Sequence, residues 1–186
     1  KNKCVYRSML KFDNICRNVC SLVTEVGSYI YEERIKLKEE DIIVKGLHNF
    51  VSYVDITSED MLKAGLRKIF LDAGFICEES GEDRRFEYNW VIDPLDGTTN
   101  YIHGMPFYSI SVALMRREEV VLGVVYDIER RNIYYSYDGL DCSYKNRDKI
   151  YVSDVRLIED ALIGTGFPYS DFKYMVEYIE LFKYFM

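Results

Sequence analysis

The sequence predicts an α+β fold in which helices come first along the chain and strands follow. Apolar residues recur at three- and four-residue steps over roughly the first 34 positions, which is typical of an amphipathic helix. From residue 75 onward the apolar runs are short and separated by turn residues, which is typical of strands. Helices followed by strands in this order favour an α+β arrangement.

Composition and charge limit the class of protein further. The chain has 186 residues, of which 48% are hydrophobic, enough to bury a core in one ordered domain. The 24 basic and 31 acidic residues give a formal net charge of −7, which argues against direct nucleic-acid binding. The chain contains no apolar run near 20 residues, so we expect no membrane span.

The N-terminal residues show no signal-peptide pattern, and the five cysteines form no Cys-x-x-Cys pair. An odd number of unpaired thiols is typical of a reduced compartment. We therefore expect a cytoplasmic protein.

The first helix is predicted over about residues 3–34, followed by a charged stretch and a β-like run at 42–44. A short extended segment is predicted at 51–55. A second helix should follow it, with Asp55 or Thr57 as the N-cap residue. Gly74 is expected to end that helix.

Short apolar runs bounded by turn residues predict the strands. The predicted strands are residues 75–77, 89–92, 108–115, 120–126 and 133–137, with shorter candidates at 150–153 and 161–165. Residues 120–137 should form a hairpin, and residues 172–186 are expected to form a final helix.

One segment concentrates residues with chemical potential. The apolar strand at 90–92 runs directly into Asp93-Pro94-Leu95-Asp96-Gly97-Thr98-Thr99-Asn100. Two carboxylates three residues apart, with a backbone carbonyl between them, are hard oxygen ligands that suit Mg²⁺. No histidine or cysteine lies within this run, which argues against zinc. The alternative is that Asp93 and Asp96 only cap and turn the chain.

A second acidic pair, Glu78 and Glu79, follows the predicted strand at 75–77. It lies fifteen residues before Asp93, so the two clusters can meet if their strands are neighbours in the sheet. The alternative is a solvated, charged loop with no ligand.

These residues carry a family resemblance. The run from Asp93 to Asn100, with Trp90 before it and Pro106-Phe107 after it, resembles the first signature of the inositol monophosphatase family. Further segments also resemble the family: Glu78-Glu79-Ser80, in which Cys77 replaces a glycine, Val54-Asp55, Gly123-Val124-Val125-Tyr126 and Gly164-Thr165-Gly166-Phe167-Pro168. The resemblance implies the layered α-β-α-β-α fold of the Mg²⁺-dependent, lithium-sensitive sugar phosphatases.

The resemblance also assigns roles to residues. Glu78 and Asp93, with the Leu95 carbonyl, correspond to ligands of a first Mg²⁺, and Asp93 with Asp96 to ligands of a second. The substrate phosphate would lie against Glu78, Leu95, Asp96, Gly97 and Thr98, with the backbone N–H groups of Gly97 and Thr98 as donors. Thr98, hydrogen bonded to Asp55, would help to activate the attacking water.

The implied reaction is hydrolysis of inositol monophosphate or a similar small polyol phosphate. Metal ions would neutralise the phosphate charge and lower the pKa of a bound water, so no protein nucleophile is needed. Other substrates of the same superfamily remain alternatives: fructose bisphosphate, a phosphoadenosine nucleotide or NADP phosphate. The family also implies a homodimer.

The family's second signature, a Trp-Asp followed closely by Ala and Gly, is not found in this sequence, whose single tryptophan is Trp90. Its aspartate completes the second metal site in the family. We therefore interpret residues 1–150 as an N-terminal metal-binding α+β part and residues 151–186 as the start of an incomplete C-terminal α/β part. Two interpretations stay open: a piece of a longer enzyme, inactive by itself, or a truncated, non-catalytic binding or regulatory module.

Overall fold

The computed structural model describes residues 2–37, 42–46, 49–83, 86–167 and 171–186. Its elements, in chain order, are α1 (Asn2–Glu33), β1 (Ile42–Gly46), β2 (Asn49–Ser52), α2 (Tyr53–Ile69), β3 (Ala73–Cys77), β4 (Gly81–Asp83), β5 (Tyr88–Asp96), α3 (Thr98–Ile102), β6 (Ser109–Arg116), β7 (Glu119–Asp127), β8 (Asn132–Tyr137), β9 (Ser143–Lys145), β10 (Asp148–Ile150), the 3₁₀ turn η2 (Ile158–Asp160) and α4 (Met175–Tyr184).

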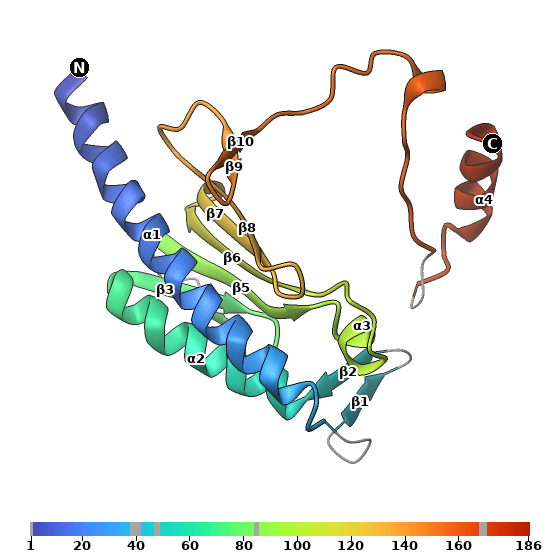
Figure 1. Cartoon of the computed structure of the whole chain (residues 1–186), viewed down its shortest axis with the longest axis horizontal. Helices are drawn as coiled ribbons and strands as arrows, with labels where there is room; N and C mark the ends of the chain where they lie inside the picture. Colours follow the sequence, from blue (N-terminus) through green and yellow to red (C-terminus); the bar gives the residue numbers. More distant parts are fainter. Residues whose placement is uncertain (1, 38–41, 47–48, 84–85, 168–170) are drawn as a thin grey trace.

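An eight-stranded sheet forms the body of the molecule, with the strand order β10-β9-β8-β7-β6-β5-β3-β4. Strands β3 and β5 run parallel, whereas the other neighbouring strands of this sheet pair antiparallel. A separate two-stranded sheet joins β1 and β2. Helices α1 and α2 lie side by side across one face of the large sheet (Figure 1). The predicted α+β class and its layered arrangement are confirmed.

The core lies between these two helices and the sheet. Helix α1 contributes an apolar stripe at three- and four-residue steps, and strands β5, β6 and β7 contribute the facing side chains. Fully buried members include Val19, Val23, Val26 and Ile30 of α1, Leu62 and Leu66 of α2, and Trp90, Ile110, Leu114 and Leu122 of the sheet. The predicted amphipathic first helix is therefore confirmed.

Helix α2 differs from its prediction at both ends. It begins at Tyr53, so the segment at 51–55 is not extended throughout, and its N-cap is Ser52 rather than Asp55 or Thr57. The Ser52 side chain accepts from the N–H of Val54 at 3.2 Å, while Asp55 accepts from the N–H of Ser52 at 2.8 Å. This reciprocal capping box needs Asp55 inside the first turn, which explains why Asp55 is not itself the cap.

The C-terminal end of α2 was also predicted wrongly. The helix ends at Ile69, and Gly74 lies in β3. The reason is tertiary: Ala73 and Gly74 pair with Tyr88 and Asn89 of β5, and this ladder takes the chain out of the helix early.

The five principal strand predictions and the hairpin at 120–137 are confirmed by β3 and β5 to β8. The three-residue strands β4, β9 and β10 were missed. The candidates at 150–153 and 161–165 are wrong, because β10 ends at Ile150 and the described residues beyond it pair with no strand. The predicted final helix is confirmed by α4.

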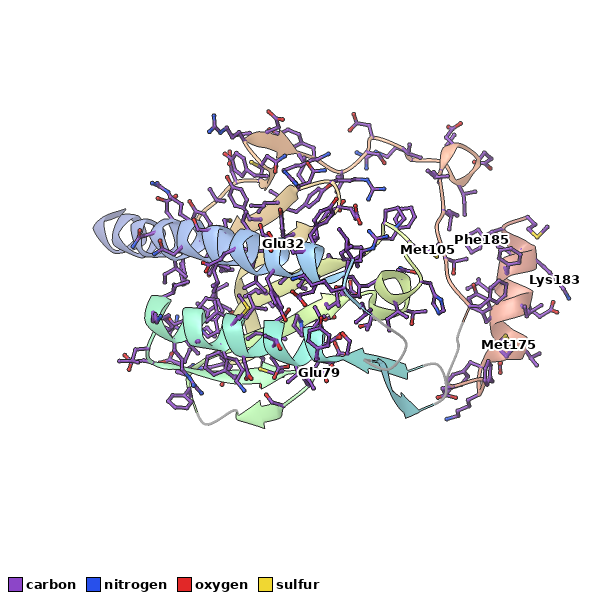
Figure 2. All side chains as sticks on the ribbon, turned by 60° about the horizontal axis from the view of Figure 1, so that its bottom comes forward. Glu32, Glu79, Met105, Met175, Lys183 and Phe185 are labelled. Atoms are coloured by element: carbon purple, nitrogen blue, oxygen red, sulfur yellow. The ribbon has the colours of Figure 1, made fainter. Side chains whose placement is uncertain are left out.

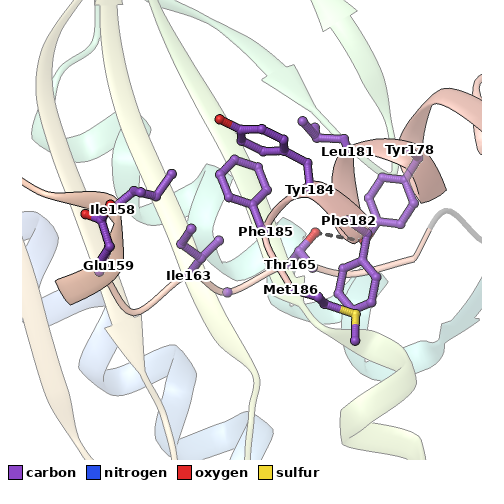
Figure 3. A pocket seen from close by; sticks show the side chains of 12 residues that line it. Ile158, Glu159, Ile163, Thr165, Tyr178, Leu181, Phe182, Tyr184, Phe185 and Met186 are labelled. Atoms are coloured by element: carbon purple, nitrogen blue, oxygen red, sulfur yellow. Dashed lines mark hydrogen bonds between the residues drawn. The ribbon is translucent and has the colours of Figure 1, made fainter.

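Beyond β10 the chain leaves the sheet and runs to α4, which lies apart from the sheet (Figure 1). Residues 158–165 and α4 enclose a cavity of about 800 Å³, with Ile158 and Ile163 on one side and Tyr178 and Phe182 on the other (Figure 3). Thr165 and Tyr178 join the two segments by a hydroxyl hydrogen bond of 2.9 Å.

Large apolar side chains are exposed along this C-terminal segment, including Tyr151, Val152, Leu157, Leu162, Phe167, Val176, Leu181, Tyr184 and Met186. Apolar surface of this extent is typical of a face that packs against further protein. None of the described helices combines the length and the apolar composition needed to cross a lipid bilayer.

Candidate metal and phosphate site

The parallel pairing of β3 and β5 brings the two acidic clusters together. Cys77, the last residue of β3, lies opposite Ile92 of β5. The next residues along the two strands, Glu78 and Asp93, therefore emerge at the same edge of the sheet. The N–H of Glu78 donates to the Ile92 carbonyl at 3.3 Å and keeps the register to that point. The condition set by the sequence, that the two strands be neighbours, is met.

Asp93 lies in an environment that disfavours its charged form. Burial, the neighbouring charges of Glu78 and Asp96, and a hydrogen bond with Glu78 raise the pKa of Asp93 to about 7. A hydrogen bond from the Leu95 N–H, at 3.2 Å, acts in the opposite direction. The negative charges of Glu78 and Asp96 repel the charged form of Asp93, and a bound cation would relieve that repulsion.

A bulge in β5 shapes the next residues. Asp93 lies opposite Ser111 and Asp96 opposite Ser109, so β5 carries one residue more than β6 in this interval. Pro94 falls inside the bulge, where its missing N–H costs the ladder nothing. The bulge also turns the chain so that the Leu95 carbonyl accepts from the Thr98 hydroxyl at 2.9 Å.

Gly97 makes the turn into α3 in a conformation that few other residues adopt. Its φ of 89° and ψ of 34° lie in the left-handed region. A Cβ at this position would meet the Phe107 carbonyl oxygen at 2.7 Å, and that oxygen also accepts from the Asn100 side chain at 2.7 Å. The N–H groups of Thr98, Thr99 and Asn100 open α3 and have no acceptor within their own helix, whereas the N–H of Tyr101 donates to the Gly97 carbonyl at 3.0 Å.

The first turn of α2 is joined to this loop by one hydrogen bond. The Thr98 hydroxyl lies 3.1 Å from Oδ1 of Asp55, whose side chain is buried. The other oxygen, Oδ2, accepts from the N–H and the hydroxyl of Ser52, at 2.8 and 2.6 Å. The two hydrogen bonds from Ser52 therefore hold the Asp55 carboxylate in the position where it accepts from Thr98.

Sequence reasoning missed two supporting residues. Glu59, one helical turn after Asp55, is buried and accepts from the N–H of Glu79 at 2.8 Å, which anchors the acidic loop to α2. Figure 2 places Glu79 beside the end of α2 that adjoins β2. The spacing of four residues from Asp55 is a signal for a shared helix face. Ser52 was missed too, although Ser52-x-x-Asp55 has the capping-box spacing.

The carboxylates form an incomplete set of metal ligands. Within the described part of the chain, no group of three His, Cys, Asp or Glu side chains is placed to hold a metal ion as it stands. Glu78 and Asp96 are exposed, and Asp96 accepts a long hydrogen bond of 3.4 Å from Ser109. Glu78 and Asp96 are close enough for their charges to act on Asp93. The three carboxylates fit Mg²⁺ if they draw closer around the ion and water, phosphate or further protein supplies the remaining oxygens.

The fold is that of a layered α+β protein. Its candidate cation site consists of carboxylates at the ends of two parallel strands, and its candidate anion site consists of the left-handed Gly97 and the first N–H groups of α3. The sequence model of the inositol monophosphatase family matches residues 10–186. This chain belongs to the inositol monophosphatase family, as its motifs predicted.

Individual relatives and solved structures agree. The chain is 38% identical over 167 residues to a "Fructose-1,6-bisphosphatase/inositol-1-monophosphatase" of Aquifex aeolicus, covering 89% of this chain and 63% of that protein. It is 40% identical over 144 residues to a "Putative Nus factor SuhB" of Neisseria meningitidis serogroup B, covering 76% and 55%.

Among solved structures, the extragenic suppressor protein suhB of Bartonella henselae superposes with a TM-score of 0.81 at 27% identity, covering 90% of this chain and 66% of that one. The inositol monophosphatase (IMPase) of Thermotoga maritima superposes with a TM-score of 0.67 at 29% identity, covering 73% and 52%. The chain thus spans about half to two thirds of the length of these relatives.

Proposed function

We propose that this chain provides the metal-binding and phosphate-binding part of a phosphomonoesterase that acts on inositol monophosphate or a similar small polyol phosphate. The observation that carries the proposal is the β3–β5 register, which sets Glu78 beside Asp93. The raised pKa of Asp93 supports it, because a carboxylate surrounded by like charges is ready to bind a cation.

Glu78, Asp93, Asp96 and the Leu95 carbonyl would hold Mg²⁺. When bound, Mg²⁺ would neutralise the phosphate charge and make an attacking water more acidic. The Leu95 carbonyl keeps a lone pair for this purpose, since a carbonyl oxygen can accept twice and Thr98 occupies only one position.

Gly97 and Thr98 would hold the phosphate oxygens through their N–H groups. Thr98 would also orient the attacking water: its one hydroxyl proton is shared between the Asp55 carboxylate and the Leu95 carbonyl, so the hydroxyl oxygen keeps lone pairs that can accept a hydrogen bond from water. Glu78, Leu95 and Asp96 would line the same phosphate position from the metal side.

The test measures Mg²⁺ binding by titration calorimetry on this chain, and phosphate release from inositol monophosphate by the complete protein. We expect the chain to bind Mg²⁺ and Asp93→Asn to lose both binding and turnover. Phosphate release by Asp93→Asn that does not depend on Mg²⁺ would overturn the proposal. A panel with fructose bisphosphate, NADP and a phosphoadenosine nucleotide separates the substrate alternatives.

The names of several relatives favour a second candidate function. Four further SuhB relatives are named Nus factors or putative Nus factors, at 33–40% identity to this chain. The second candidate is therefore a binding module in a transcription assembly. A partner complex that survives Asp93→Asn, together with no phosphatase activity in the parent protein, would favour this function.

A further inference from the structure

A second cavity, of about 620 Å³, lies between α1 and the strands β8 and β9, and no residue of the acidic loop lines it. Two thiols from α1, Cys16 and Cys20, line it from one side. Tyr135 and Tyr144 line it from the other, with their rings stacked at 5.4 Å and 9°. The proposed phosphatase site uses none of these residues.

The two thiols have different surroundings. They are four residues apart and therefore share one face of α1. Cys16 is 2% exposed, whereas Cys20 is half-buried and reaches the cavity. A hydrogen bond from the Cys16 thiol lowers the pKa of Cys20, and the same bond with burial raises the pKa of Cys16. Cys20 is thus the nucleophile of the pair.

The charged groups around the cavity are Asp13, Arg17 and Arg147, which give a net charge of +1. Asp13 is already engaged, since it pairs with Arg17 and accepts from the Tyr137 hydroxyl at 3.0 Å. Arg147 has no ion-pair partner within the described residues. A guanidinium in this position favours an anionic ligand.

We propose that Cys20 is a modification site, at which an anionic low-molecular-weight disulfide enters this cavity and forms a mixed disulfide with the protein. The Cys20 thiolate attacks one sulfur of the ligand, a Cys20–S bond forms and the ligand's S–S bond breaks. Cys20 is oxidised, and the departing half of the ligand is reduced to a thiol that takes its proton from water.

The adduct should persist and not pass to Cys16. Residues four apart on a helix have Cβ atoms about 5–6 Å apart, whereas a disulfide needs about 3.8 Å. Closing Cys16 onto Cys20 would require a distorted turn of α1. The role of Cys16 is therefore positioning: it donates a hydrogen bond to the reacting sulfur.

The first experiment incubates the whole chain with glutathione disulfide and follows intact mass and peptide maps. We expect one glutathionyl adduct, located on Cys20, lost in Cys20→Ser and removed by dithiothreitol. Cys142→Ser is the matched control, since Cys142 is another half-buried thiol outside the cavity lining, and it should leave the rate unchanged. A first adduct on another cysteine, or an internal Cys16–Cys20 disulfide, would overturn the proposal.

The second experiment tests the hydrogen bond. Cys16→Ala removes the donor and Cys16→Ser keeps one. Each unit by which the Cys20 pKa rises should slow modification about threefold at neutral pH, because the tenfold loss of thiolate is partly offset by higher nucleophilicity. Cys16→Ser should restore the parent pH–rate profile, whereas equal profiles for both variants would contradict the positioning role.

The third experiment tests recognition of charge. Rates with anionic glutathione disulfide are divided by rates with neutral hydroxyethyl disulfide. Arg147→Gln should lower this ratio several-fold and leave the rate with the neutral disulfide unchanged. An unchanged ratio would remove the anionic class of ligand from the proposal.

Discussion

The hydroxyl of Thr98 lies 3.1 Å from Oδ1 of Asp55, although 43 residues separate them in the chain. Asp55 belongs to the first turn of α2 and Thr98 to the first turn of α3, so this contact ties two helix starts together. The capping box of α2 thereby serves two purposes, because Asp55 both completes the cap and receives Thr98. Helix stability and site geometry depend on the same carboxylate.

This sharing predicts that changes at Thr98 separate activity from stability. Thr98→Val removes the hydroxyl at nearly constant volume and should lower kcat of the complete protein about 100-fold or more, with a stability loss of about 1 kcal/mol. Thr98→Ser keeps the donor and should retain most of kcat. Steady-state kinetics and urea unfolding measure the two effects. Equal kcat values for the two variants would rule out a role for the hydroxyl.

Changes on the other side of the contact should act mainly on folding. Ser52→Ala removes the N-cap side chain and should destabilise the chain by about 1–2 kcal/mol. Thr57→Ala is a suitable control, because the structure assigns Thr57 no cap role in α2. Urea unfolding followed by circular dichroism gives the difference, and a Ser52→Ala loss no larger than that of Thr57→Ala would contradict the cap.

The pH dependence follows from Asp93. Its pKa is raised from 3.8 to about 7 in the folded chain, so the folded state binds the proton more tightly than the unfolded state. Without Mg²⁺, stability is therefore full below about pH 4, falls as the pH rises and has lost this contribution above about pH 7. Asp93→Asn should flatten that fall in thermal unfolding measured in EDTA.

Mg²⁺ should oppose this fall in stability at rising pH, because it binds the deprotonated carboxylate of Asp93. The increase in melting temperature on adding Mg²⁺ should grow between about pH 6 and pH 8. Asp141→Asn is a surface control whose response to Mg²⁺ should match the parent chain. A Mg²⁺ effect that is the same at both pH values would show that Asp93 is not a ligand.

The glycine at the turn into α3 offers a test with an internal reference. Gly97 and Gly81 have similar positive φ angles, 89° and 85°, but a Cβ at Gly97 would meet the Phe107 carbonyl oxygen at 2.7 Å, whereas at Gly81 it would meet nothing within 4 Å. Both alanine variants should lose about 1 kcal/mol or more of stability, because alanine is strained in the left-handed backbone conformation. Gly97→Ala should lose additional stability, measured by urea unfolding, and phosphate affinity with it. Equal losses would show that the carbonyl moves aside freely.

The sequence predicted the acidic clusters of the site and the condition for their meeting, but not how the strands pair. Alternation and turn residues locate β3 and β5 in the chain, and only the tertiary ladder shows that Cys77 lies opposite Ile92. The same ladder ended α2 at Ile69, before the glycine that a local rule favours. Pairing between distant segments overrides local propensity at such positions.

Short elements escaped prediction for a different reason. Strands β9 and β10 have three residues each, too few for any period of two to emerge from the sequence. Ser52 and Glu59 were missed because neither is distinctive as a residue type. Their importance comes from what they contact: the Asp55 carboxylate in one case and the N–H of Glu79 in the other.

The packing of α1 gives the last prediction, through two mid-helix glycines. A Cβ added at Gly27 would meet the ring of Tyr126 on β7 at 2.4 Å, and one added at Gly65 of α2 would meet the end of the Leu22 side chain at 2.5 Å. Alanine is favoured over glycine in a helix by about 1 kcal/mol at both sites. The two substitutions therefore differ only in what must move.

Tyr126 is a rigid ring held at 5% exposure in the core, whereas Leu22 is half-buried and can change rotamer. Gly27→Ala should therefore destabilise the chain by about 1–3 kcal/mol, because the helix must move off the sheet. Gly65→Ala should stay within about 1 kcal/mol of the parent, since propensity and a small rearrangement offset each other. Urea unfolding of both variants decides the matter. If the Gly27→Ala chain were as stable as the Gly65→Ala chain, the close contact between α1 and the Tyr126 ring of β7 would not limit the size of residue 27.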